Sequence, residues 1–353
     1  WAHSQTAGEA AIAVSVARGL PRLAAQFGPA LLDKAVADAA LRAAGQSWVE
    51  GLRSGVLGDP WSGQLALVRP TQVVLRHTVG LADRLTAEDP GTDPQDGLPA
   101  TLQAAIQRHG LHHFKLKLCG QIDADLERLA RIAEVLQGVG GDWRVTLDGN
   151  ETFSDAASLG RFWQTLQATP ALDALLQRTL LLEQPIARAV ALRESIASLG
   201  IQVPVILDES DDHDTALEEG LTLGYRGISS KACKGIYRSL ANAHRIAQDP
   251  RLLLSGEDLT CQAGLAVQQD TLLAASLGVQ HIERNGHHYV DGFGSAPADE
   301  AMAFAEAHPS LYETGSGRPH LNVRHGRLDL ISLHVTGFAS AAMPQWRSLQ
   351  TIH

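Results

Sequence analysis

Short apolar runs that alternate with longer helical patterns are the feature of this 353-residue chain that most limits its fold. Segments such as Ile122–Val139, Ala156–Gln167 and Arg188–Leu199 separate the runs and are long enough for crossover helices. Strands that alternate with helices favour βαβ units and a parallel sheet. From about residue 71 to residue 290 we count eight runs: Gln72–His77, His113–Leu118, Trp143–Leu147, Leu180–Leu182, Val203–Leu207, Gly227–Ser230, Leu252–Ser255 and Val279–Ile282.

Eight units of this kind predict an α/β fold of the (β/α)8 type, a TIM barrel. A doubly wound sheet is the alternative, but no Gly-x-Gly-x-x-Gly motif follows the first run. Residues 8–48 have apolar positions at helical spacing, with Gly28-Pro29 and Gly45 as expected breaks. We therefore expect a helical part over 1–70, the barrel over 71–305, and a C-terminal segment over 306–353.

Composition excludes several classes of protein. A hydrophobic fraction of 44% is too high for a disordered chain. The net charge of −10 gives no electrostatic footprint for nucleic acid or an anionic membrane surface. No apolar run approaches the length of a membrane span. The three cysteines have no framework spacing, so we expect reduced thiols in a cytoplasmic protein.

Charged residues follow seven of the runs. In a barrel these positions lie at the carboxyl ends of the strands, where active sites are found. Asp148, Glu183 and Asp208 end three consecutive runs and are 35 and 25 residues apart, so one βα unit per interval places them side by side. Neighbouring carboxylates repel one another unless a cation lies among them, and hard oxygen ligands favour Mg²⁺, with Mn²⁺ as the alternative. The competing interpretation is that strand ends simply run into polar surface loops.

Lysine is scarce and clustered. Only five of the 29 Lys and Arg residues are lysines, and four lie in two groups, Lys115-Leu116-Lys117 and Lys231–Lys234. Arginine does not readily lose its proton, so these positions favour a group that can. Lys115 and Lys117 are two apart on a strand and share a face, where two ammonium groups lower each other's pKa. Lys231 ends the sixth run directly and is preferred over Lys234 as a catalytic group; ordinary surface lysines are the alternative.

Together these motifs resemble the enolase superfamily, and within it the muconate-lactonizing (muconate cycloisomerase) subgroup. The resemblance covers residues 30–340 and implies a modified (β/α)7β barrel with a partial α+β capping domain, formed by the incomplete N-terminal part and the returning C-terminal segment. It implies that Asp148, Glu183 and Asp208 bind Mg²⁺. It implies that Lys117 and Lys231 are acid/base groups on opposite substrate faces, that Lys115 supports Lys117, and that Asn150 and Glu209 lie behind the ligands. The motifs that carry the resemblance are Lys115-Leu116-Lys117, Asp148-Gly149-Asn150, Glu183-Gln184-Pro185, Asp208-Glu209 and Lys231.

The implied reaction is abstraction of a proton α to the carboxylate of a small molecule, which gives an enediolate held by Mg²⁺ and leads to racemisation, epimerisation or cycloisomerisation. The alternatives are a syn-dehydratase, of the acid-sugar or o-succinylbenzoate synthase type, and a non-catalytic barrel that keeps only the fold. The strand pattern of the family's cap sheet is missing ahead of the helices, which motivates the last alternative.

Substrate contacts are expected after the seventh and eighth runs, and the chain is expected to self-associate as barrels of this family do. The eighth run lacks the Asp-x-Asp that dipeptide epimerases use, which counts against a dipeptide substrate. The expected contacts are Glu257, Asp258, Glu283 and Asn285.

Overall fold

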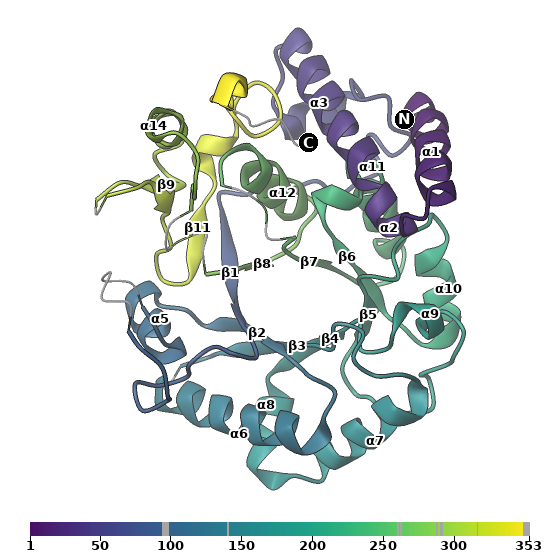
Figure 1. The fold of residues 1–353 in the computed structure, drawn as a ribbon. Coiled ribbons are helices and arrows are strands. Elements are labelled where there is room, and N and C mark those ends of the chain that lie inside the picture. Colours follow the sequence, from purple (N-terminus) through teal and green to yellow (C-terminus); the bar gives the residue numbers. More distant parts are fainter. Residues whose placement is uncertain are drawn as a thin grey trace.

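Eight parallel strands close into a barrel at the centre of the molecule (Figure 1). The computed structural model describes residues 1–93, 99–139, 141–259, 261, 263–286, 289, 292–315 and 317–348, apart from the side chain at position 3. Closure is through β1 and β8, where Leu75 lies opposite Ile282. This confirms the predicted barrel. The strands are β1 (Gln72–Val79), β2 (His113–Lys117), β3 (Arg144–Asp148), β4 (Thr179–Glu183), β5 (Val205–Leu207), β6 (Gly227–Ser230), β7 (Leu253–Gly256) and β8 (His281–Arg284).

Helices surround the barrel, and two of them have the bounds that the sequence predicts. The helix expected over Arg188–Leu199 ends early, at Ala191, because Ile196 donates its backbone N–H to the carbonyl of Leu223 instead of continuing the helix. The surrounding helices are α5 (Leu102–His109), α6 (Ile122–Val139), α7 (Ala156–Gln167), η1 (Pro170–Leu172), α8 (Asp173–Gln177), α9 (Arg188–Ala191), α10 (Ala216–Leu223), α11 (Ile236–Ile246), α12 (Leu265–Ser276) and α14 (Ala298–Ala307).

Strand alternation sorts the side chains between the barrel interior and the helical layer. Phe114 and Leu116 of β2 are buried in the hydrophobic core. Because successive strand residues point to opposite faces, Lys115 points the other way, into the barrel. Lys115 is also buried, with 1% of its surface exposed. The interior of this barrel therefore holds charged groups.

The N-terminal part is helical, as the sequence predicts, and Figure 1 shows it alongside α11. Gly28-Pro29 does not break a helix: both residues lie in the first turn of α3, where proline lacks an N–H that would have no intrahelical partner. The helix α4 begins with a capping box between Ser47 and Glu50. The elements are α1 (Ala2–Ala17), α2 (Arg22–Ala25), α3 (Phe27–Ala44) and α4 (Trp48–Ser54).

The C-terminal segment first adds a strand to the barrel and then reaches the N-terminal helices. Its β11 (Arg327–Asp329) pairs antiparallel with β1. Further on, Phe338 stacks on Trp48 with ring centroids 4.0 Å apart. The boundaries of the three expected parts stay a prediction. The remaining elements are the antiparallel pair β9 (Tyr312–Glu313) and β10 (His320–Leu321), with η3 (Ile331–Leu333) and η4 (Trp346–Ser348).

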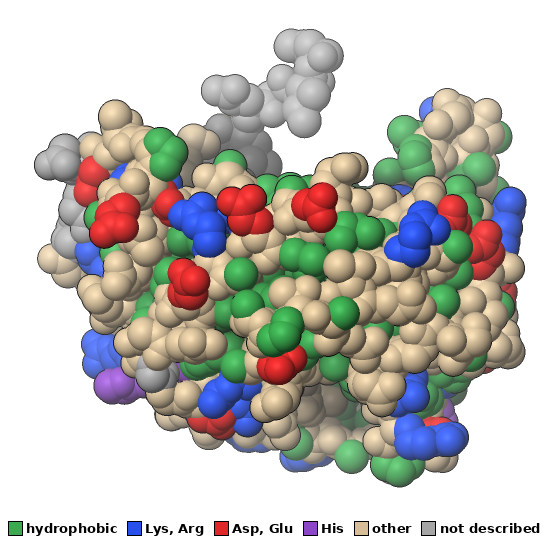
Figure 2. Space-filling view, turned by 90° about the horizontal axis from the view of Figure 1, so that it is seen from below, with side chains coloured by type: hydrophobic (Ala, Val, Ile, Leu, Met, Phe, Trp, Pro, Cys, Tyr) green, Lys and Arg blue, Asp and Glu red, His purple; other side chains and the backbone are tan. Residues whose placement is uncertain are grey.

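One face of the molecule carries charges of both signs. Figure 2 shows acidic and basic side chains interspersed on one face. Among the helices of the described residues, none combines the length and apolarity needed to cross a membrane.

Candidate active site

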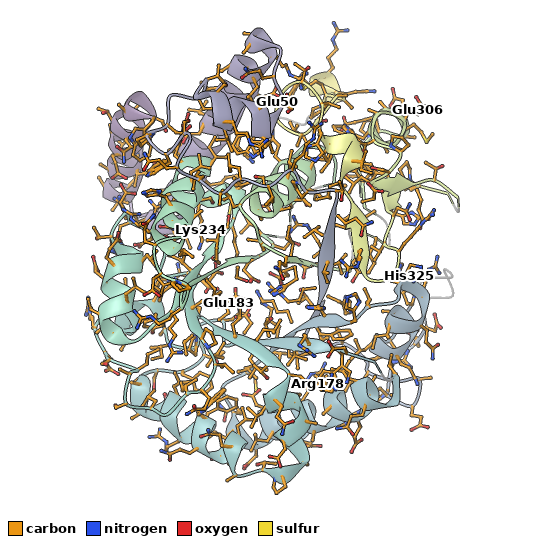
Figure 3. The ribbon with its side chains drawn as sticks, turned by 180° about the vertical axis from the view of Figure 1, so that it is seen from behind. Glu50, Arg178, Glu183, Lys234, Glu306 and His325 are labelled. Carbon is orange, nitrogen blue, oxygen red and sulfur yellow. The ribbon has the colours of Figure 1, made fainter. Side chains whose placement is uncertain are left out.

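The carboxyl ends of three neighbouring strands bring the predicted ligands together. Asp148 ends β3 and lies in register with Glu183, which ends β4, while Asp208 directly follows β5. All three side chains are buried. Figure 3 shows Glu183 near the centre of the barrel. The spacing in the sequence therefore predicts this neighbourhood correctly.

Lys115 lies between the carboxylates of four strands. Its Nζ is 2.9 Å from Asp148, 2.6 Å from Glu183, 2.8 Å from Glu257 and 3.0 Å from Glu283. Burial opposes charge on this amine, but the four carboxylates outweigh burial and hold its pKa well above the usual value. The expectation that a neighbouring lysine lowers this pKa is therefore wrong for Lys115, because the acidic groups around it dominate.

The two expected acid/base groups each contact a different carboxylate. Lys117 Nζ donates to Asp148 Oδ2 over 2.6 Å, and Lys231 Nζ donates to Asp208 Oδ2 over 2.6 Å. Lys117 ends β2, and Lys231 directly follows β6. Strands four apart in the order of an eight-stranded barrel lie across from each other, so the two amines approach the mouth from opposite sides.

Lys234 is a second lysine in contact with Asp208. It ends the short helix η2 (Ala232–Lys234) and is buried. Its Nζ donates to the backbone carbonyl of Asp208 over 2.6 Å and to Ser229 Oγ over 2.8 Å. Burial raises the pKa of Asp208, but Lys231 and Lys234 outweigh burial and hold it well below the usual value. The preference for Lys231 over Lys234 as the catalytic group stays a prediction.

Gln184 fixes the position of Asp208, a role that the sequence does not reveal. Its Oε1 accepts the backbone N–H groups of Asp208 and Ser210, at 2.9 and 3.0 Å, and its Nε2 donates to Ser210 Oγ at 2.8 Å. Its φ of 31° lies in the left-handed region, which a side chain other than glycine seldom adopts. The only signal for Gln184 is its place in the Glu-Gln-Pro motif.

Asn150 and Glu209 lie beside the ligands as expected. Asn150 donates its backbone N–H to Asp148 Oδ1 over 2.9 Å and its side-chain amide to Glu209 Oε1 over 3.2 Å. Burial, and then the charges of Asp208 and Asp148, raise the pKa of Glu209. Its second oxygen is buried and has no hydrogen-bond partner among the described residues.

Two of the four expected substrate contacts belong to the charged interior. Glu257 pairs with Lys115 and with Arg76 of β1, whose burial the apolar pattern of that strand did not reveal. Glu283 accepts Thr78 Oγ1 over 2.7 Å in addition to its contact with Lys115.

The other two expected contacts meet each other beside β8. Asn285 Nδ2 donates to Asp258 Oδ2 over 2.7 Å. Contact between any of the four residues and a substrate stays a prediction.

The carboxylates of Asp148, Glu183 and Asp208 offer oxygen donors that suit a hard divalent cation, and a lysine amine contacts each of them. Among the described residues, no three histidine, cysteine or acidic side chains converge as a metal centre. Oε2 of Glu183 lies 2.6 Å from Lys115 Nζ, whereas the buried Oε1 has no hydrogen-bond partner among the described residues. Burial and neighbouring carboxylates raise the pKa of Glu183 well above the usual value. A buried carboxylate oxygen without a partner is suited to accept a cation. Asp148, Glu183 and Asp208 are thus suited to hold Mg²⁺.

Comparison with solved structures identifies barrels of the same fold. An isomerase from Streptomyces coelicolor A3(2) matches with a TM-score of 0.57 and 18% identity, over 90% of this chain and 74% of its own. A dipeptide epimerase from Enterococcus faecalis V583, solved with Mg and L-Leu-L-Tyr, matches at 0.56 and 18%, over 87% and 70%. A muconate lactonizing enzyme from Klebsiella pneumoniae matches at 0.57 and 17%, over 93% and 81%.

Comparison of the sequence itself gives the family. No curated protein matches the chain. The family model described as "Enolase C-terminal domain-like" matches residues 98–307, which is more than half of the chain and spans β2 to β8. The protein therefore belongs to the Enolase C-terminal domain-like family, within the enolase superfamily.

Proposed function

We propose that this protein is a Mg²⁺-dependent isomerase that moves a proton at the carbon α to a carboxylate, with Mn²⁺ as the alternative ion. Lys117 and Lys231 form the acid/base pair, and the product is a racemised, epimerised or cycloisomerised small carboxylate. One observation carries the proposal: two lysines from opposite sides of the barrel each contact one of the three buried carboxylates suited to a metal.

In this proposal the two lysines act on opposite faces of the substrate. When bound, Mg²⁺ supplies positive charge that stabilises the negative charge developing on the substrate carboxylate. Lys117 Nζ removes the α proton from one face, and Lys231 Nζ delivers a proton to the other. Burial lowers the pKa of Lys231, but the charge of Asp208 outweighs burial and raises it well above the usual value. Once Asp208 is engaged by another cation, that attraction weakens, and a lower pKa lets Lys231 release its proton to the substrate more readily.

The test is exchange of the α proton in D2O with Mg²⁺, followed by NMR over a panel of N-acyl amino acids, dipeptides and muconates. Wild-type protein should exchange the proton of at least one compound. Lys117→Ala should abolish exchange from one face. Lys117→Arg is the matched control for charge: it keeps the cation but does not readily act as a base, so it should also fail.

Three outcomes separate the proposal from its alternatives. Exchange that survives in both Lys117→Ala and Lys231→Ala contradicts the acid/base pair. Exchange that survives in Lys231→Ala while product formation stops favours a syn-dehydratase, in which that lysine only stabilises charge. Wild-type protein that neither binds Mg²⁺ nor gains thermal stability from it is a non-catalytic barrel.

A further inference from the structure

A cavity of about 530 Å³ adjoins the proposed reaction centre and has two unlike sides. One side carries the reactive groups, with Asp208, Glu209 and Lys231 among its lining residues. The other side is apolar and comes from outside the barrel strands. Its large side chains are Leu23 of α2, Phe27 of α3 and Leu259, which follows β7.

The apolar side leaves large hydrophobic groups open to solvent. Phe27 is 46% exposed and Leu259 is 48% exposed. A single exposed apolar residue is ordinary, but these two come from separate elements and line the same cavity as Lys231. Ligand pockets typically combine such apolar walls with a few polar groups that orient the ligand. We call Leu23, Phe27 and Leu259 the apolar wall.

The segment from Arg22 to Phe27, which carries Leu23 and Phe27 of the wall, is fastened to the chain that follows β5. Arg22 Nε donates to the backbone carbonyl of Asp212 over 2.8 Å, and the buried Gln26 donates to the same carbonyl. Asp212 lies four residues beyond Asp208. The part of the wall formed by Leu23 and Phe27 is therefore tied to the segment that carries Asp208.

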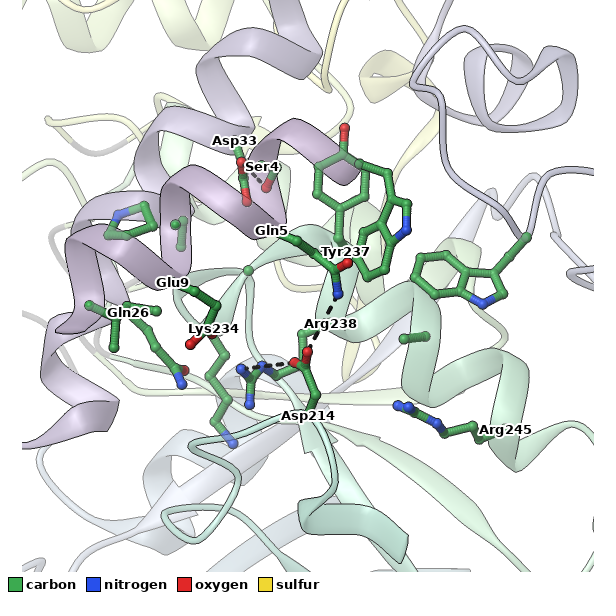
Figure 4. A pocket seen from close by; sticks show the side chains of 18 residues that line it. Ser4, Gln5, Glu9, Gln26, Asp33, Asp214, Lys234, Tyr237, Arg238 and Arg245 are labelled. Carbon is green, nitrogen blue, oxygen red and sulfur yellow. Dashed lines mark hydrogen bonds and ion pairs between the residues drawn. The ribbon is translucent and has the colours of Figure 1, made fainter.

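The neighbouring helix α1 is held against the barrel as well. Figure 4 shows Gln5 of α1 directed at Asp214, which also pairs with Arg238 of α11. Both contacts are 3.4 Å. The helix α1 therefore contacts the segment between β5 and α10, next to the segment that α2 contacts.

Two cations besides Lys231 line the cavity, and both are already paired; the first, Lys234, lies 2.9 Å from Asp208 Oδ1. Arg188 lines the cavity, but its guanidinium is bound to the Glu151 carboxylate at 2.5 and 2.7 Å. That pair compensates the charge of Arg188. The space beyond Lys231 is consequently best suited to an uncharged apolar group.

We propose that the substrate carries, besides its reacting carboxylate, an aliphatic or aromatic arm that packs against Leu23, Phe27 and Leu259. This inference rests on the proposed function and specifies its substrate class. It favours apolar carboxylates over polyhydroxylated acid sugars, because sugar hydroxyl groups would lose hydrogen bonds to water against this wall.

The test measures the binding of butanoate, hexanoate and octanoate by calorimetry, with Mg²⁺ and with EDTA, and uses only the Mg²⁺-dependent part. For wild-type protein, the dissociation constant should fall about three- to fourfold per added methylene, as expected when each methylene leaves water. Phe27→Ala and Leu259→Ser should reduce this to less than about twofold per methylene. Leu32→Ala is the matched control, because Leu32 lies on α3, is 69% exposed and lies outside the cavity.

The outcomes distinguish the wall from the chemistry. Mg²⁺-dependent binding that is independent of chain length, or a dependence unchanged by Phe27→Ala, overturns the apolar arm and leaves the proposed function standing. The absence of Mg²⁺-dependent binding for all three carboxylates, together with no α-proton exchange, overturns both.

Discussion

At the scale of single residues, Lys115 controls the charge balance inside the barrel. Four carboxylates surround its amine, on β3, on β4, directly after β7 and on β8. The buried Arg76 is a second cation, which pairs with Glu257. Removing one partner from a buried ion pair is costly because the remaining charge stays buried without compensation. The amine of Lys115 therefore supplies positive charge that the fold itself requires.

Replacing Lys115 with methionine should destabilise the metal-free protein strongly. The change keeps the length of the side chain and removes its charge, so Asp148, Glu183 and Glu257 would repel one another. We expect the free energy of unfolding in EDTA to fall by about 3–5 kcal/mol. Mg²⁺ should recover more stability in this variant than in wild type, as measured by urea denaturation.

Lys117→Met is the matched control for that experiment. Its side chain is 23% exposed, and Asp148 would keep Lys115 as a partner at 2.9 Å, so the loss of Lys117 should cost clearly less than the loss of Lys115. Equal losses in the two variants would show that Lys115 has no special place in the charge balance.

The sequence predicts one property of Lys115 and misses another. Two-residue periodicity correctly places it on the same face as Lys117, and both amines contact Asp148 Oδ2. Its contacts with Glu257 and Glu283 join residues 142 and 168 positions apart. Local patterns carry no information about such pairings, which arise only when the barrel closes.

At the scale of elements, the ends of β3 and β4 approach each other too closely for any side chain at position 149. A Cβ on Gly149 would lie 2.4 Å from Pro185 Cα. Gly149 also donates its backbone N–H to the Glu183 carbonyl over 2.9 Å. This contact keeps Asp148 and Glu183 side by side.

Gly149→Ala should therefore separate two of the proposed ligands. We expect it to weaken Mg²⁺ binding at least tenfold and to lower the free energy of unfolding by about 1–3 kcal/mol, because neither backbone can move freely. Calorimetry and urea denaturation measure the two effects. Gly138→Ala in α6 is the control: its Cβ would meet nothing within 4 Å, so it should be neutral or stabilising. Mg²⁺ affinity that is unchanged in Gly149→Ala would contradict this account.

The sequence predicts elements well where one signal dominates. Apolar runs locate all eight strands to within about two residues, and helical periodicity gives the bounds of α6 and α7. The helix expected over Arg188–Leu199 fails because the contact between Ile196 and Leu223 replaces its last turns. Tertiary hydrogen bonds of this kind override local preference.

At the scale of the whole molecule, two half-buried histidines make the fold sensitive to acid. Burial, and then nearby positive groups, lower the pKa of His113 to about 4 and that of His281 to about 3. An unfolded histidine titrates near 6.5, so the unfolded chain binds more protons than the folded protein in the pH range between the folded and unfolded pKa values. The stabilising contribution is complete above pH 6.5 and is lost as the pH falls toward the folded values.

Acid should therefore lower the free energy of unfolding by up to about 1.4 kcal/mol per pH unit for each histidine, between pH 6.5 and about 4.5. His281→Gln keeps an acceptor for Arg76, which lies 2.7 Å from the ring, and should reduce the slope by up to one proton. Urea denaturation across this range measures the slope. The raised pKa of Glu183 changes the free energy of unfolding with pH in the opposite direction. Both proteins contain Glu183, so its contribution cancels when the two slopes are compared. An identical slope in the variant would contradict the role of His281.

The sequence predicts the barrel better than it predicts the contacts that join the two ends of the chain. Alternating strands and helices are sufficient to predict the barrel. The packing of Phe338 on Trp48 and the pairing of β11 with β1 join the two ends of the chain. Both depend on contacts between residues more than 250 positions apart, which no local period reveals.

The separate origin of the apolar wall has a consequence for redesign. The lysines and carboxylates lie at the ends of barrel strands, whereas Leu23 and Phe27 lie on helices that precede the barrel. Under the proposed substrate class, a small library at positions 23, 27 and 259 would change the shape of the accepted molecules while leaving the proton-transfer groups intact. New specificities are therefore accessible to this scaffold without rebuilding its chemistry.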